Sequence, residues 1–270
     1  MATSFDPHVA ATTIEKLRAG GRESTRDELA VEEPLEIRVD GEALAVTMRT
    51  PGEDEDLAVG FLAGEGLIGG PQDIVEVGPT RDFAANTVDV RTRNGLRRDP
   101  KDERSFYLTS SCGVCGKGAL EFVRQEAPPV SEAPAIERRI VLAAPGKARE
   151  EQHAFERTGG LHATGLFTQD GDLLVVREDV GRHNAMDKAI GSLLRAGKFP
   201  LTGTFASVSG RASFELVQKA SLAGLFALVA VGPPSTLAVD LARERGMLLC
   251  GFVRGDSLNV YAGGQLLANP

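Results

Sequence analysis

The run Leu225-Phe-Ala-Leu-Val-Ala-Val231 leads directly into Gly232-Pro-Pro-Ser235-Thr236. A continuous apolar run that ends at glycine and proline predicts a short strand buried on both faces. Ser235 stands where a helix N-cap would stand, because its hydroxyl can accept a hydrogen bond from the first free amides of a helix over 236–244. A buried strand followed by a helix is the repeating unit of α/β proteins.

The same alternation continues on either side of this stretch. Apolar strands separated by helices of about ten residues predict an α/β fold, in which helices cover both faces of a largely parallel sheet. The predicted strands are Leu161–Phe167, Leu173–Arg177, Gly203–Val208, Leu225–Val231 and Met247–Val253, and the predicted helices are Asn184–Leu194, Ser213–Ala223 and Thr236–Glu244.

A smaller α+β unit precedes this region. Asp40-Gly41 lies between two apolar runs, Leu35–Val39 and Leu44–Met48, and this arrangement predicts a β-hairpin. Residues Asp54–Leu67 begin with acidic side chains and carry an apolar stripe, which is typical of an amphipathic helix. Short strands are expected after it, at residues 75–77 and 87–90.

These patterns divide the chain into segments. We expect a mobile polar arm over residues 1–30, with a weak helical pattern around Ile14 and Leu17, and a small α+β domain over residues 31–105. Residues 106–135 contain a Cys-x-x-Cys loop and a proline-rich connection, which marks a domain boundary. Residues 136–270 form the larger α/β domain.

The formal charge of the 270-residue chain is −8 at pH 7. A broad nucleic-acid surface needs clustered Lys and Arg, so we expect no nucleic-acid partner, and any phosphate recognition must be local. No apolar run reaches the roughly 20 residues that span a bilayer, and the N-terminal residues lack the pattern of a secretion signal. We therefore expect a cytoplasmic protein with no membrane association.

Two of the three cysteines lie in Ser111-Cys112-Gly-Val-Cys115-Gly-Lys117. Thiolate is the reactive form of cysteine, and a neighbouring lysine can lower a thiol pKa. On these residues alone, the pair is half of a zinc site, a redox pair or a sulfur carrier. A structural disulfide is disfavoured in a reducing compartment. The third cysteine, Cys250, is predicted to be a small buried apolar residue.

Zinc fits the sequence poorly. A structural zinc site needs four Cys or His ligands, and no second paired motif completes the set. A zinc nucleobase deaminase requires His-x-Glu ahead of Pro-Cys-x-x-Cys, whereas this chain has His162-Ala-Thr164 after its cysteines. We expect the protein to hold no metal of its own.

Polar residues concentrate in loops that follow the predicted strands, where α/β sheets bind ligands. Ser209-Gly210-Arg211 resembles a phosphate-binding turn, and Phe252–Ser257 offers an arginine for phosphate and a carboxylate for a purine edge. The stretch Arg177–Lys188 brings Arg182 and His183 to a helix start, with a salt-bridged helix cap as the alternative.

Two further features have a structural and a functional interpretation. His162 stands between paired glycines at a strand start, which favours a general acid/base or an anion partner, although a lone histidine is often structural. The turn Gly232–Thr236 is either a rigid helix cap or a ligand contact.

Taken together, these motifs resemble the formate dehydrogenase accessory sulfurtransferase family. The resemblance implies a sulfurtransferase that accepts sulfur from a cysteine desulfurase as a cysteine persulfide. It passes this sulfur to a molybdenum bis(molybdopterin guanine dinucleotide) cofactor required by formate dehydrogenase. The matching stretches, in chain order, are Asp56–Ile68, Ser111–Lys117, Thr158–His162, Glu178–Lys188, Ser209–Arg211 and Gly251–Gly255.

The resemblance also carries expectations about fold and residues. It implies a cytidine-deaminase-like α/β/α sandwich for the larger domain, and a homodimer. It places the persulfide on Cys112, with Cys115 as the partner in transfer. Together with the loop residues above, it implies that the cofactor contacts His162, Arg182, His183, Ser209, Gly210, Arg211, Phe252, Val253, Arg254, Gly255, Asp256 and Ser257.

Two functions from other classes remain as alternatives. One is a cofactor-binding chaperone that serves a molybdoenzyme without handling sulfur. The other is a zinc-stabilised regulatory protein. A chaperone should tolerate the loss of both thiols, whereas a sulfurtransferase should not. A zinc-stabilised protein should contain stoichiometric zinc when it is purified.

Overall fold

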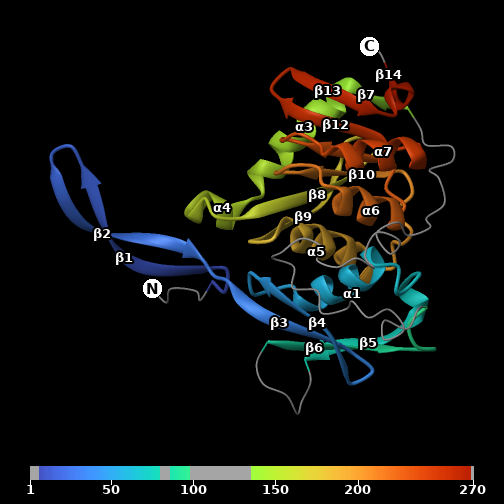
Figure 1. Ribbon diagram of the computed structural model, residues 1–270, viewed down its shortest axis with the longest axis horizontal. Coiled ribbons are helices and arrows are strands. Elements are labelled where there is room, and N and C mark those ends of the chain that lie inside the picture. The colour runs from blue at the N-terminus through green and yellow to red at the C-terminus, as the bar shows by residue number, and fades with distance from the viewer. Residues whose placement is uncertain (1–5, 80–85, 98–134, 269–270) are drawn as a thin grey trace.

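The computed structural model describes residues 6–79, 86–97 and 135–268. Its largest element is a six-stranded sheet in the order β13-β12-β11-β10-β8-β9 (Figure 1). Its strands are β8 (His162–Thr168), β9 (Leu173–Asp179), β10 (Thr204–Val208), β11 (Ala227–Ala230), β12 (Leu248–Arg254) and β13 (Ser257–Ala262).

This sheet is mixed, and the prediction of a largely parallel sheet is wrong. β10, β11 and β12 are parallel to one another, whereas β8, β9 and β13 each pair antiparallel. The predicted strands themselves are present. A run of apolar residues predicts that a strand is buried on both faces of the sheet. It does not predict whether the strand pairs parallel or antiparallel with its neighbours.

Helices cover both faces of the sheet. On one face lies α3 (Arg138–Glu150), above a cluster that includes the stacked rings of Phe167 and Phe205, whose centroids are 5.2 Å apart. On the other face lie α5 (Arg182–Arg195), α6 (Phe214–Leu222) and α7 (Thr236–Arg245). The α/β class is therefore confirmed, and the likeness to cytidine deaminases stays a prediction.

Two helices and three strands of the larger unit have no counterpart in the sequence analysis: α3, α4 (His153–Thr158), β13 and the two-residue strands β7 (Ile136–Glu137) and β14 (Leu267–Ala268). In α3, Val141, Ala144 and Ala148 are buried at helical spacing, but Pro145 lies inside the helix and hides the pattern. Proline removes one backbone donor and usually argues against a helix interior.

The small unit consists of a four-stranded sheet in the order β4-β3-β6-β5 and helix α1 (Asp54–Gly64). The predicted hairpin at Asp40-Gly41 is confirmed, because both residues have positive φ in the turn between β3 and β4. The strands are β3 (Glu33–Val39), β4 (Glu42–Arg49), β5 (Ile74–Pro79) and β6 (Thr87–Thr92), with a short 3-10 helix, η1 (Pro71–Asp73), before β5.

The small unit packs on the large one through α1 and α5. At the crossing, a Cβ on Gly60 would lie 1.8 Å from the carbonyl oxygen of Asp187, and one on Gly191 would lie 1.9 Å from that of Asp56. A real Cβ atom cannot lie this close to another atom, so the two helices can approach each other this closely only because both residues are glycine. Residues of both units contribute to a single hydrophobic cluster around this contact.

Residues 9–30 form an antiparallel hairpin of β1 (Val9–Arg18) and β2 (Gly21–Ala30), which extends away from the body (Figure 1). The predicted helical pattern around Ile14 and Leu17 is wrong, because both residues are in β1. The hairpin is held at its base by Arg157 of α4, whose guanidinium bonds to Glu28 at 2.6 and 2.9 Å.

The remaining elements close the larger unit. β7 (Ile136–Glu137) pairs parallel with β14 (Leu267–Ala268), next to a 3-10 turn, η3 (Gly264–Leu266). None of the helices in the described ranges has the length and apolar character needed to cross a membrane.

Candidate functional site

The carboxyl ends of the three parallel strands lie along one edge of the larger sheet (Figure 1). β10 ends at Val208, β11 at Ala230 and β12 at Arg254. β8 runs in the opposite direction, so its first residue, His162, comes to the same edge. Open α/β sheets bind ligands at such an edge. The structure thus brings together loops that the sequence analysis selected one by one.

Three glycines bring backbone segments close together at this edge, and we call Gly210, Gly232 and Gly251 the strand-end shelf. The amide of Gly232 donates to the carbonyl of Gly210 at 3.0 Å, and the amide of Phe252 donates to that of Gly232 at 3.2 Å. A Cβ on Gly232 would lie 3.0 Å from the Gly210 oxygen, and one on Gly251 would lie 3.1 Å from the Gly232 oxygen. Glycine at these positions therefore lets the three strand-end loops pack closely against one another.

The imidazole of His162 lies beside the shelf. A Cβ on Gly210 would be 3.4 Å from its Nδ1. Burial lowers the pKa of His162, and the charges of Arg182 and His183 lower it further, against a smaller opposing effect of Asp179. His162 is therefore largely neutral at pH 7, with one ring nitrogen that donates and one that accepts.

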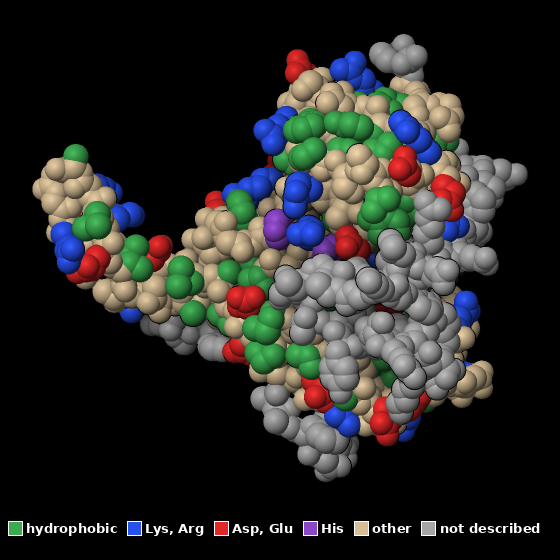
Figure 2. All heavy atoms as spheres, in the orientation of Figure 1, with side chains coloured by type: hydrophobic (Ala, Val, Ile, Leu, Met, Phe, Trp, Pro, Cys, Tyr) green, Lys and Arg blue, Asp and Glu red, His purple; other side chains and the backbone are tan. Residues whose placement is uncertain are grey.

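Arg182 and His183 open helix α5 at the same edge. The Nε of Arg182 is buried and has no hydrogen-bond partner within the described part of the chain. His183 Nε2 lies 3.2 Å from Ser213 Oγ and 3.6 Å from a carboxylate oxygen of Glu215. The hydrogen bond to His183 lowers the pKa of Glu215 to about 2. Figure 2 shows histidine side chains among Lys and Arg side chains on this part of the surface.

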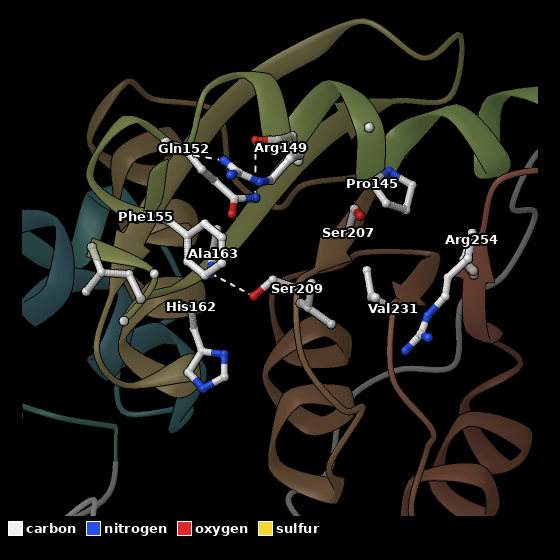
Figure 3. Close-up of a pocket in the computed structure, with 17 residues that line it drawn as sticks. Pro145, Arg149, Gln152, Phe155, His162, Ala163, Ser207, Ser209, Val231 and Arg254 are labelled. Atoms are coloured by element: carbon white, nitrogen blue, oxygen red, sulfur yellow. Dashed lines mark hydrogen bonds between the residues drawn. The ribbon is translucent and has the colours of Figure 1, made fainter. Parts of the chain in front are cut away.

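A cleft of about 650 Å³ opens between this edge and the α3–α4 segment. His162, Ser209 and Arg254 line it from the strand ends, and Arg149, Gln152 and Phe155 line it from the helices (Figure 3). None of the described residues that line it is acidic, although the chain carries a net charge of −8. The cleft therefore suits an anionic ligand.

Ser209 also ties the strands together at the cleft. Its Oγ accepts a hydrogen bond from the amide of Ala163 at 2.9 Å, and its own amide donates to the carbonyl of Ala163 at 3.0 Å. The hydroxyl hydrogen is not used in either bond. Arg211 follows on the outer side of this turn, is exposed, and packs against Gly232.

The predicted stretch 252–257 divides into two parts. Val253 and Arg254 line the cleft. Phe252 is 41% exposed and has a φ of 52°, a rare backbone conformation for a residue with a side chain. Gly255 and Asp256 form the exposed turn between β12 and β13, Ser257 is the exposed first residue of β13, and none of the three lines the cleft. The carbonyl of Asp256 accepts a hydrogen bond from Arg138.

Much of the charge in Arg177–Lys188 is used inside the fold. Asp179 is fully buried and accepts hydrogen bonds from the amides of Thr50 and Gly181 and from the side chain of Asn184. Lys188 is also fully buried and lies 2.9 Å from Asp179. The predicted ion pairing at this helix is therefore present, but the predicted side-chain cap is not, because the N-cap residue is Gly181. Arg182 and His183 lie at the start of α5 and are not among the residues that line the cleft. Ser235 caps α7 as predicted, through the amide of Ala238.

Three lining residues, Arg149, Gln152 and Phe155, were missed by the sequence analysis. They lie at the end of α3 and the start of α4, so the signal that identifies them is the buried spacing of α3. Without that helix, nothing places residues 149–155 near the strand ends.

The predicted catalytic residues, Cys112 and Cys115, lie outside the described residues. Cys250 is described, and it is buried within the apolar cluster under α3, as predicted. Burial raises the pKa of its thiol to about 12. Cys250 is therefore a packing residue that does not ionise at neutral pH.

Comparison with known proteins agrees with this architecture. The chain is 49% identical over 267 residues to the sulfur carrier protein FdhD of Streptomyces avermitilis, covering 94% of this chain and 93% of that protein. It is 47% identical over 273 residues to the protein of that name from Anaeromyxobacter dehalogenans, covering 96% and 93%.

A solved structure from Desulfotalea psychrophila, described as that of a formate dehydrogenase accessory protein, has the same fold. It superposes with a TM-score of 0.78 at 24% identity and covers 97% of this chain and 100% of that one. The sequence model of the FdhD/NarQ family matches residues 30–268. With this match over most of its length, and with relatives at nearly half identity, the chain belongs to the FdhD/NarQ family.

Proposed function

We propose that this protein is a sulfur carrier that delivers sulfur to a molybdenum bis(molybdopterin guanine dinucleotide) cofactor for formate dehydrogenase. Its relatives are named sulfur carrier proteins, and its sequence holds a Cys-x-x-Cys pair. The structural observation that carries the proposal is the cleft beside the strand-end shelf. It is lined by Arg149, His162 and Arg254 and, among the described residues, by no carboxylate.

The cofactor is the substrate here, and the site residues fit its phosphates. The buried Nε of Arg182 lacks a partner among the described residues, and the imidazole of His162 lies beside the shelf. Arginine binds phosphate oxygens through charge-assisted hydrogen bonds. We assign the phosphate contacts to His162, Arg182, His183, Ser209, Gly210, Arg211 and Arg254, and we keep Phe252, Val253, Gly255, Asp256 and Ser257 as the adjoining contact segment.

The sulfur chemistry belongs to Cys112 and Cys115. The Cys112 thiolate attacks the outer sulfur of a cysteine persulfide on the donor, a cysteine desulfurase, and the donor leaves as a thiolate. Cys115 then attacks the inner sulfur of Cys112. The outer sulfur departs as hydrosulfide toward the metal, and a Cys112–Cys115 disulfide remains. A dithiol reductant restores both thiols, which balances the two electrons given to the sulfur.

The wider setting of this reaction also forms part of the proposal. The acceptor is formate dehydrogenase, the protein acts as a cytoplasmic homodimer, and the larger unit has the cytidine-deaminase-like α/β/α scaffold. The alternative is a cofactor-binding chaperone that does not handle sulfur.

Mass spectrometry tests the sulfur step. After incubation with a cysteine desulfurase and cysteine, the wild-type protein should gain the mass of one sulfur atom, and Cys112→Ala should gain none. Cys250→Ala is the matched control, because Cys250 is buried and should leave the gain unchanged. If Cys112→Ala still accepts sulfur and still supports formate dehydrogenase activity, the assignment is overturned. If loss of both Cys112 and Cys115 leaves that activity intact, the chaperone function is the correct one.

A further inference from the structure

We propose that His8 is a proton-dependent latch that holds the base of the β1–β2 hairpin against the start of helix α1. The hairpin projects from the body of the molecule (Figure 1), so its direction depends on the contacts at its base. The inference goes beyond the proposed function, because it concerns how residues 6–31 are attached to the body and does not involve the transfer of sulfur.

The base of the hairpin is a turn in which His8 stands directly before β1. The carbonyl of His8 accepts a hydrogen bond from the amide of Val31 at 2.9 Å, and this bond closes the hairpin just beyond the end of β2. The imidazole packs on Gly52, in the loop before α1. A Cβ on Gly52 would lie 2.9 Å from Nε2 of the ring, so only glycine leaves room for the imidazole here.

Both ring nitrogens of His8 face carboxylate oxygens. Nδ1 lies 3.1 Å from Oδ1 of Asp6, and Nε2 lies 3.6 Å from Oε2 of Glu53. An ionised carboxylate only accepts hydrogen bonds, whereas a neutral imidazole has one donor nitrogen and one acceptor nitrogen. In the neutral form, one ring lone pair would therefore face a negative charge. The imidazolium form has a donor for each carboxylate, so this geometry favours the protonated ring.

The surrounding charges agree with this geometry. The contact with Glu53 raises the pKa of His8 above its ordinary value of 6.5, burial opposes this effect, and the charge of Asp6 adds to it. Lys188 of α5, whose Nζ lies 3.8 Å from Oε2 of Glu53, lowers the pKa of His8. Arg157 of α4 also approaches the turn, because its guanidinium bonds to Asp6 at 2.5 Å. The two carboxylates outweigh the opposing effects, so the ring keeps its proton to a higher pH than a free histidine does.

The backbone at Glu53 attaches this carboxylate to the body of the protein. Glu53 directly precedes α1 and has a φ of 51°, in the left-handed region that is rare for a residue with a side chain. Such a conformation persists where the surrounding contacts hold it. The carbonyl of Glu53 accepts a hydrogen bond from the amide of Leu57 in the first turn of α1, at 2.9 Å. Glu53 is therefore the fixed side of the latch, and His8 is the side that belongs to the hairpin.

The hairpin has a second attachment whose charges do not change between pH 6 and 8. Arg157 bonds to Glu28 of β2 and to Asp6, and arginine and carboxylate side chains stay ionised over this range. The His8 contact contributes fully below pH 6.5 and is lost as the pH rises through the raised pKa of His8. Loss of the proton therefore loosens the hairpin from α1 and leaves it attached to α4.

NMR titration tests the ring. The chain has four histidines, and the His8 signal is identified by its absence from His8→Gln. Its midpoint should lie above pH 6.5, and Glu53→Gln should lower that midpoint. Glu32→Gln, an exposed change next to Val31, is the control and should leave the midpoint unchanged. A wild-type midpoint at or below pH 6.5 would overturn the latch.

Hydrogen exchange tests the attachment. After correction for the intrinsic effect of pH, the Val31 amide of the wild-type protein should exchange severalfold faster at pH 8 than at pH 6. His8→Gln should show the fast rate at both pH values, and His8→Arg, which keeps the charge and the donors, should show the slow rate at both. His153→Gln, at an exposed histidine, should behave like wild type. Amides of β10 and β11 are the internal reference, since their unchanged protection separates an open latch from a misfolded variant.

Two results of the exchange experiment would contradict the inference. Equal exchange of the Val31 amide at the two pH values in wild type would show that the proton does not control the attachment. If His8→Gln kept the wild-type pH dependence, a group other than His8 would be responsible.

Discussion

The Nζ of Lys188 lies 2.9 Å from the Oδ2 of Asp179, and neither side chain has any exposed surface. The two residues belong to the larger unit, but Lys188 also donates to the carbonyl of Thr50 at 2.8 Å, and Asp179 accepts from the amide of Thr50 at 3.1 Å. This ion pair therefore joins the end of β9 and the middle of α5 to the loop that leads into α1.

Lys188→Met should lower the free energy of unfolding by about 3–5 kcal/mol, because it leaves the Asp179 carboxylate buried without a counter-charge. Urea denaturation at pH 7 measures the loss. Lys198→Met, at an exposed position, is the control and should change little. A double change of Lys188→Met with Asp179→Asn should recover part of the loss. An unfolding free energy for Lys188→Met within 1 kcal/mol of wild type would contradict this account.

Gly60→Ala should destabilise the protein by about 2–3 kcal/mol or more, since the new methyl group would overlap the Asp187 carbonyl at the crossing of α1 and α5. Gly146→Ala provides a matched comparison, because it is also a helical glycine but has no atom within 4 Å of its added Cβ. That change should leave stability unchanged or raise it by about 0.5–1 kcal/mol. Thermal unfolding of the two variants should therefore shift in opposite directions or by clearly unequal amounts.

The pairing of Glu215 with His183 should give a pH-dependent contribution to stability. The pKa of Glu215 is about 2 in the folded protein, below its ordinary value of 4.5, so the folded state binds a proton less readily than the unfolded state. The contribution is therefore fully present above pH 4.5 and is lost as the pH falls toward 2. Urea denaturation of wild type and Glu215→Gln at pH 6, 4 and 3 should show a difference that shrinks with acidification. A difference that stays constant over this range would be the contrary result, with Glu150→Gln as the exposed control.

Cys250 should not react with iodoacetamide at pH 8 while the protein is folded. Its thiol pKa of about 12 leaves almost no thiolate, and the side chain has no exposed surface. Peptide mass spectrometry should find Cys250 alkylated only after urea is added. Modification of Cys250 in the native protein, at the rate seen for the unfolded chain, would show that this packing is not maintained.

The parts of the site that sequence could predict are those set by local patterns. Ser209-Gly210-Arg211 and Arg254 follow apolar strands, and parallel strands bring their carboxyl ends to one edge, so their meeting was expected. His162 reaches that edge for a different reason, because β8 is antiparallel and presents its first residue there. The glycines on either side of His162 identify it as a candidate site residue, but they do not predict that β8 runs antiparallel to β10.

Other features depend on contacts between distant residues. The carboxylate of Asp179 accepts a hydrogen bond from the amide of Thr50, which is 129 residues away in the sequence. The sequence around Asp179 does not reveal this contact, so its structural role could not be predicted. The cleft wall at Arg149 and Phe155 requires α3, and Pro145 conceals that helix. The β1–β2 hairpin was missed because its side chains are mostly exposed and mixed in charge, which removes the apolar alternation that identifies a strand.

The glycine crossing of α1 and α5 has a consequence for how the chain can be cut. The hydrophobic cluster around it holds Leu35, Ile37 and Val88 from one side of the 98–134 stretch together with Ile190, Leu216 and Leu228 from the other. The two sides share this interior, so they should melt in a single calorimetric transition. Cleavage of the backbone between residues 97 and 135 should then give a nicked molecule whose fragments stay together on a sizing column until denaturant is added.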